Sequence, residues 1–227
     1  MTISHERALA HISNTFDSIP NVDELLQLVE IEFIRKDAVQ NAANKARYLR
    51  LIFDLLEAGT STVAYEAATA LTALTSNPVA VKAAATKLIE LCAKEADNNV
   101  KLIVLDKVET LRQQHGLDDS LTMEVLRVLT SPDLDVRKKA LGIALELVSS
   151  KNIDEMLLLL RKELQKSTDS TQEKADEYRQ QLIRTISQCA IQYPAASEGV
   201  VDTLITFIAD KMHMVIMVMA CFAILFA

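Results

Sequence analysis

The sequence predicts an all-α fold, a right-handed α-solenoid of HEAT/armadillo-like helix pairs, because one apolar template recurs on successive helices. The template has offsets 0, +4, +5, +8 and +11, a spacing that lines one face of a 3.6-residue helical period. Its copies start at Val63, Val100 and Val136, so that 37 and then 36 residues separate the starts. A weaker copy starts at Tyr178. A fixed period of this size, filled by helices, is typical of solenoids whose helix pairs bury their apolar faces by stacking. The three full copies are Val63, Ala67, Ala68, Leu71, Leu74; Val100, Val104, Leu105, Val108, Leu111; and Val136, Ala140, Leu141, Ala144, Leu147.

The composition agrees with this class and argues against others. Half of the residues are hydrophobic but only 4% are aromatic, and four Gly and four Pro leave little turn chemistry for an all-β fold. The net charge of −7 argues against a nucleic-acid binder, which needs excess Lys and Arg. Cys92, Cys189 and Cys221 form no CxxC pair, so neither a disulfide framework nor a zinc ribbon is indicated. No basic segment followed by an apolar one opens the chain, which argues against secretion and favours the cytosol.

Polar caps predict where the helices of the first half begin. Asn21 stands directly before an apolar-periodic run, where a side-chain oxygen can accept a hydrogen bond from a first-turn N–H, and Asp97-Asn98-Asn99 supplies a capped turn. Thr75-Ser76-Asn77-Pro78 ends one helix and starts the next, because Pro is tolerated in the first turn of a helix. Ser61 or Thr62 is expected to cap the helix that carries Val63. The expected helices are 4–18, 22–35, 45–58, 63–74, one that starts at Pro78, and 100–114.

Glycines and prolines predict further boundaries. Gly59 and Gly116 stand at helix C-termini, where a residue free to adopt positive φ is favoured. At the start of the central helix, Ser131 can cap, Pro132 can occupy the first turn, and Asp133 suits the positive helix end. The expected elements of the second half are helices 119–129 and 131–149, a helix opening at Asn152 or Asp154, a polar loop at 166–177, and helices 178–193 and 199–209.

The sequence changes character after Asp210. We expect residues 1–210 to form the solenoid and residues 211–227 to be an apolar tail, foreign to the protein and derived from an altered or truncated 3′ end. The alternative is a tail anchor, but the sixteen residues 212–227 span about 24 Å as a helix, short of the roughly 30 Å hydrocarbon core. The chain opens on a repeat with no polar capping helix before it, so we expect the natural protein to extend upstream.

Motifs for catalysis or metal binding are missing from the sequence. His5 and His11 are six residues apart, off the four-residue spacing that puts two ligands on one helix face. The sequence contains no GxxxxGK, GxGxxG or GxSxG motif. We therefore predict no catalytic, cofactor-binding or metal-binding residues, no cofactor, and a protein that is not an enzyme.

Some acidic and sulfur-containing residues are candidates for a functional site. Three acid pairs stand close in sequence: Glu30 and Glu32, Asp118 and Asp119, and Asp133 and Asp135. Neighbouring acids at helix starts are more often caps than an acid and a base, so we interpret these pairs as structural. Cys92 and Cys189 fall on apolar stripes and are interpreted as small core residues.

The basic run Arg137-Lys138-Lys139 follows Val136 in the central helix. It is compatible with contact to an acidic partner or to lipid headgroups. The solvated side of a repeat helix is the simpler interpretation, and we favour it.

Two segments carry a resemblance to a known family. They are DNNVKLIVLD at 97–106 and SPDLDVRKK at 131–139, within a longer similar passage at 75–148. In these segments the chain closely resembles the β-subunit family of coatomer, the COPI vesicle coat. Residues 174–180 also look like that family's DKYRQLLVRT stretch, and weaker likeness runs from about residue 5 to about residue 210.

The resemblance implies an internal piece of the N-terminal trunk of a much longer coat subunit. It implies a non-enzymatic role in vesicle-mediated transport from the Golgi to the endoplasmic reticulum and within the Golgi. The implied partners are δ-, γ- and ζ-type coatomer subunits and an Arf-type small GTPase in its GTP state, with peripheral association of a cytosolic protein to Golgi membranes. No nucleic acid is implied. Another HEAT-repeat adaptor, such as a clathrin-adaptor large subunit or a transport receptor, is the alternative, because solenoid geometry alone does not separate the two.

Overall fold

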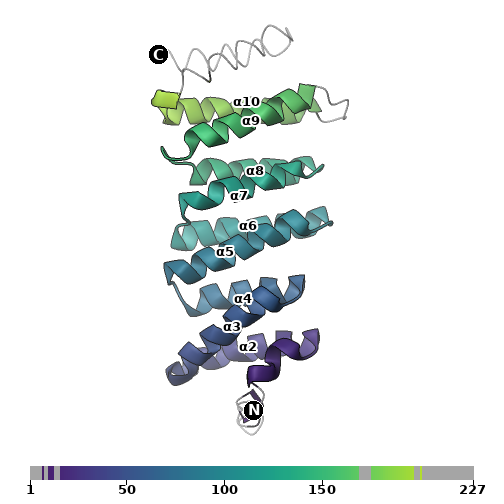
Figure 1. The fold of residues 1–227 in the computed structure, drawn as a ribbon, viewed down its shortest axis with the longest axis vertical. Helices are drawn as coiled ribbons and strands as arrows, with labels where there is room; N and C mark the ends of the chain where they lie inside the picture. Colours follow the sequence, from purple (N-terminus) through teal and green to yellow (C-terminus); the bar gives the residue numbers. More distant parts are fainter. Residues whose placement is uncertain (1–6, 8–9, 13–15, 169–174, 197–199, 201–227) are drawn as a thin grey trace. The chain divides into compact units, whose positions relative to one another are not determined.

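The computed structural model describes residues 7, 10–12, 16–168, 175–196 and 200 of the chain (Figure 1). These residues contain nine α-helices, five 3-10 helices and no strand, which confirms the predicted all-α class. They fall into two compact units, Met1–Leu117 and Asp118–Ala227. The predicted apolar tail at 211–227 and nearly all of the helices expected at 4–18 and 199–209 lie outside the described residues.

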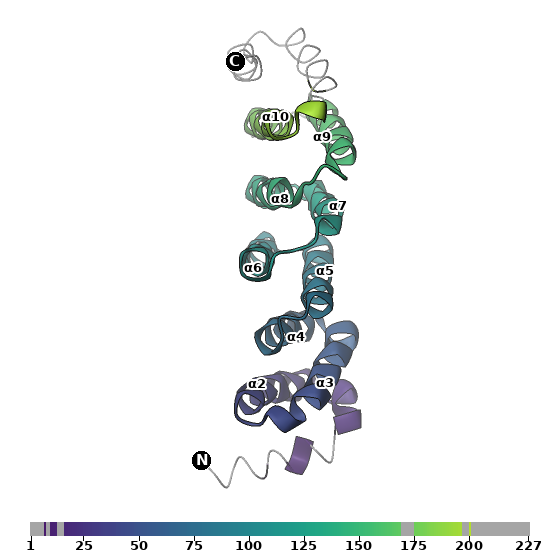
Figure 2. The same ribbon diagram turned by 90° about the vertical axis from the view of Figure 1, so that its left-hand side faces the viewer.

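In the first unit the helices alternate between two layers. Figure 2 shows α2, α4 and α6 in one layer and α3 and α5 in the other, so that each helix packs against the one before and the one after it. The elements are η1 Phe16–Asn21, α2 Glu24–Gln40, η2 Ala42–Asn44, α3 Lys45–Ala58, α4 Ser61–Leu74, α5 Pro78–Lys94 and α6 Asn98–His115.

The second unit repeats the arrangement, with α8 and α10 in one layer and α7 and α9 in the other. The helix expected at 119–129 is divided into η3, α7 and η4. The elements are η3 Asp119–Leu121, α7 Thr122–Leu126, η4 Arg127–Thr130, α8 Leu134–Leu147, α9 Ile153–Thr168, α10 Ala175–Gln192 and η5 Pro194–Ala196.

The recurring apolar template forms most of the core. We expect seven of the template residues to be buried between the helix layers because they share one template, and six of them are less than 8% exposed. The exception is Val100, which is 39% exposed, so that prediction is wrong. Val100 stands at the edge of the buried stripe of α6, which begins one residue later with the largely buried Lys101. The six buried residues are Val63, Leu71, Val108, Val136, Ala144 and Leu147.

The caps explain where the helices start. The capped turn predicted at 97–99 is confirmed, because Asp97 accepts from the Asn99 N–H at 2.7 Å. Asn77 caps α5, which starts at the expected Pro78, and accepts from the Val79 N–H at 2.9 Å. Each satisfies a first-turn donor that the helix itself cannot.

Three other predicted caps are displaced by one or two residues. Asp23, not Asn21, caps α2, and Thr60, not Ser61 or Thr62, caps α4. Asp133, not Ser131, caps α8, which places Pro132 before the cap instead of in the first turn. In each case several residues suited to capping are neighbours in sequence, and only the backbone geometry selects one of them.

The two glycines at helix ends act in different ways. Gly116 ends α6 with φ of 65°, as predicted. Gly59 ends α3 with φ of −70°, so the prediction of positive φ is wrong there. A Cβ at Gly59 would lie 2.5 Å from the Leu55 carbonyl oxygen and 2.6 Å from the Val63 Cγ1. Gly59 therefore provides room for the close approach of α3 and α4.

Buried polar groups fix the turns between helices. Asp37 of α2 is fully buried and accepts hydrogen bonds at 2.7 Å from the Tyr48 hydroxyl of α3 and from the Asn41 side-chain amide. In the second unit, Asn152 donates to the Asp119 carbonyl oxygen at 2.8 Å, and Ser149 donates to the Asp119 carboxylate at 2.6 Å. These bonds hold the turn between α8 and α9 against the start of η3.

Candidate interaction surfaces

The acid pairs singled out from the sequence have separate structural contacts. Asp118 caps η3, and Asp133 caps α8. Glu32 is paired with Arg35 at 2.6 Å and with Lys36 at 3.0 Å. Glu30 is buried, and this burial raises the pKa of its carboxyl group, while the nearby His11 acts to lower it.

The two described cysteines are core residues, as interpreted from the sequence. Cys92 and Cys189 are fully buried, and burial raises the pKa of each thiol to about 11. A thiol with so high a pKa is protonated at neutral pH and is a poor nucleophile. His11 lies exposed, and His5 is outside the described residues.

The basic run Arg137-Lys138-Lys139 of α8 makes contacts within the second unit. The Arg137 guanidinium lies 4.5 Å from the centroid of the Tyr178 ring, and its Nε donates to the Ser131 carbonyl oxygen. Lys138 forms an ion pair with Glu177 of α10. All three residues of the run are half-buried. The run therefore joins α8 to α10 and is less solvated than we expected.

The described residues contain no group of three or more His, Cys, Asp or Glu side chains placed to hold a metal ion. Among the helices that the structure describes, none combines the length and the hydropathy needed to cross a membrane.

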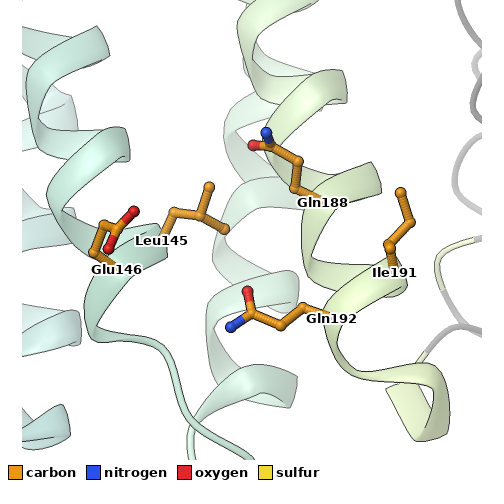
Figure 3. A pocket seen from close by; sticks show the side chains of 5 residues that line it. All are labelled: Leu145, Glu146, Gln188, Ile191 and Gln192. Atoms are coloured by element: carbon orange, nitrogen blue, oxygen red, sulfur yellow. The ribbon is translucent and has the colours of Figure 1, made fainter.

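An open groove lies between α8 and α10, with a volume of about 320 Å³. Figure 3 shows its lining: Leu145 and Glu146 from the last turn of α8, and Gln188, Ile191 and Gln192 from the last turns of α10. Sequence reasoning missed this site. A signal was present, because the template copy that starts at Tyr178 assigns other residues of α10 to the core and leaves these three on the opposite face.

A second groove, of about 290 Å³, lies between α3 and α5. The Lys87 side chain spans this groove, and its Nζ donates to the Glu57 carbonyl oxygen at 3.2 Å. Val79 on the rim is 74% exposed. The other lining residues are Lys82, Ala83, Thr86 and Glu90.

Besides Val79 of α5, large apolar side chains are exposed on α2 and α6 of the first unit. On α2, Leu25 and Val29 are 71% and 66% exposed, and on α6, Ile103 is 55% exposed beside Val100. These residues give the unit apolar surface in addition to its core.

Within each unit the described residues form stacked helix pairs that offer contact faces. The model of the adaptin N-terminal region matches residues 2–223. The chain therefore belongs to the adaptin N-terminal region family.

Within that family the chain is similar to coatomer subunit beta from several organisms. It is 42% identical to the Drosophila melanogaster protein over 208 residues, 90% of this chain and 22% of that protein. It is 43% identical to the Rattus norvegicus protein over 210 residues, 91% of this chain and 22% of that protein. The Saccharomyces cerevisiae protein is 43% identical over 211 residues, 92% of this chain and 22% of that protein. The chain thus spans about a fifth of the length of these relatives, and the resemblance predicted from the sequence is confirmed.

Proposed function

We propose that the chain is a structural part of the COPI vesicle coat and works as a section of the trunk of a β-type coatomer subunit. The observation that carries this proposal is the identity of 42 to 43% to coatomer subunit beta over nine-tenths of the chain. The role is non-enzymatic and serves vesicle-mediated protein transport from the Golgi to the endoplasmic reticulum and within the Golgi.

The proposed partners follow from the same likeness. They are the δ-, γ- and ζ-type coatomer subunits and an Arf-type small GTPase in its GTP state, at the cytoplasmic surface of Golgi membranes and COPI-coated vesicles. A stack of helix pairs suits this work because it presents extended faces to several partners at once. The exposed apolar residues of α2 and α6 support protein partners. The net charge of −7 argues against nucleic acid as a partner.

The alternative is another HEAT-repeat adaptor, such as a clathrin-adaptor large subunit or a transport receptor. The match to the adaptin N-terminal region is compatible with that reading as well. The identity to coatomer subunit beta favours the coat.

Co-purification tests the proposal. The chain, tagged and expressed in eukaryotic cells, is expected to retain coatomer subunits above a tag-only background in quantitative mass spectrometry. Gly59→Ala is the control with a disturbed fold, because its Cβ would collide with the Val63 side chain of α4 and separate α3 from α4, so it is expected to retain fewer coatomer subunits. Recovery of clathrin adaptors or nuclear-transport proteins, and no coatomer subunits, would contradict the proposal.

Recruitment to membranes tests the proposed role of the small GTPase. In flotation with Golgi-like liposomes, the coatomer complex that contains the tagged chain is expected to float only with the GTP-loaded GTPase. Equal flotation with the GDP-loaded GTPase would contradict the role of the nucleotide state.

A further inference from the structure

We draw no further inference here: the strongest candidate, the apolar face of α2 on which Leu25, Leu26 and Val29 are exposed in the first unit, carries nothing because no contact in the described part of the chain shows what covers it.

Discussion

Helices α4 and α6 begin in the same way and bury their first template residue to different degrees. Thr60 and Asp97 cap the two helices, and the capped N–H groups belong to Val63 and Val100. Val63 is fully buried, whereas Val100 is 39% exposed. Within the first unit, α4 packs against α2, α3 and α5, while α6 packs mainly against α5. Burial therefore depends on the helices that surround a position, and an apolar residue at the template position is not sufficient.

The largest expected effect on stability is at template residues that are fully buried in α4 and in α6. Leu71 of α4 and Leu111 of α6 are both fully buried. Replacing either leucine by alanine should lower the free energy of unfolding by about 2 to 5 kcal/mol, through lost transfer energy and the cavity left behind. Urea denaturation of the two variants measures this. A cost below 1 kcal/mol at Leu111 would mean that α6 contributes less to the core than its burial indicates.

Removing either cap should lower the free energy of unfolding by a smaller amount than the leucine substitutions, and the two losses should be similar. Thr60→Ala and Asp97→Ala each remove a side-chain acceptor from the first turn and should cost about 0.5 to 2 kcal/mol. Asp97 receives two backbone N–H groups and Thr60 one, so the aspartate variant should be the more destabilised. Thermal unfolding of both proteins decides the order, and a larger effect at Thr60 would contradict it.

The smallest expected effect is electrostatic and concerns the pKa of Lys107 on α6, which depends on charged groups of α4 and α2. Burial lowers the pKa of Lys107 on α6, while Glu66 of α4 acts to raise it and Arg35 of α2 to lower it. Because the folded state disfavours the charged amine, Lys107 opposes folding at neutral pH, and this opposition disappears as the pH rises through the lowered pKa toward 10.5.

Substitution of the two neighbours should therefore move the Lys107 pKa in opposite directions. Glu66→Gln should lower it further, and Arg35→Gln should bring it back toward its usual range. A side-chain NMR titration of Lys107 measures both shifts. Shifts of the same sign, or none, would mean that these three helices do not share one electrostatic environment.

The helical class and most of the core could be predicted because stacked helix pairs repeat one spacing of apolar residues. Val136, Ala144 and Leu147 occupy the buried positions that the spacing assigns. Val100 could not be predicted correctly, since a periodic pattern identifies the apolar side of a helix but does not count the helices packed around it.

The finer local geometry was also beyond the sequence. The requirement at Gly59 comes from the approach of two helices and not from its φ angle, so turn chemistry alone could not identify it. The groove between α8 and α10 is formed by residues that are far apart in sequence. The template copy at Tyr178 leaves Gln188, Ile191 and Gln192 outside the core but does not show which residues of another helix lie opposite them. The resemblance to the coat subunit came from segments of similar amino-acid sequence and not from the fold, because other solenoids have the same two-layer arrangement of helices.

The most direct test of the central claim, that stacking on neighbouring helices decides what is buried, is a matched pair of alanine substitutions followed by urea denaturation. Val63→Ala should lower the free energy of unfolding by about 2 kcal/mol, because it removes buried methyl groups. Val100→Ala should change it by less than about 0.5 kcal/mol, and the better helix propensity of alanine should make that change favourable. Equal destabilisation by the two substitutions would contradict the claim.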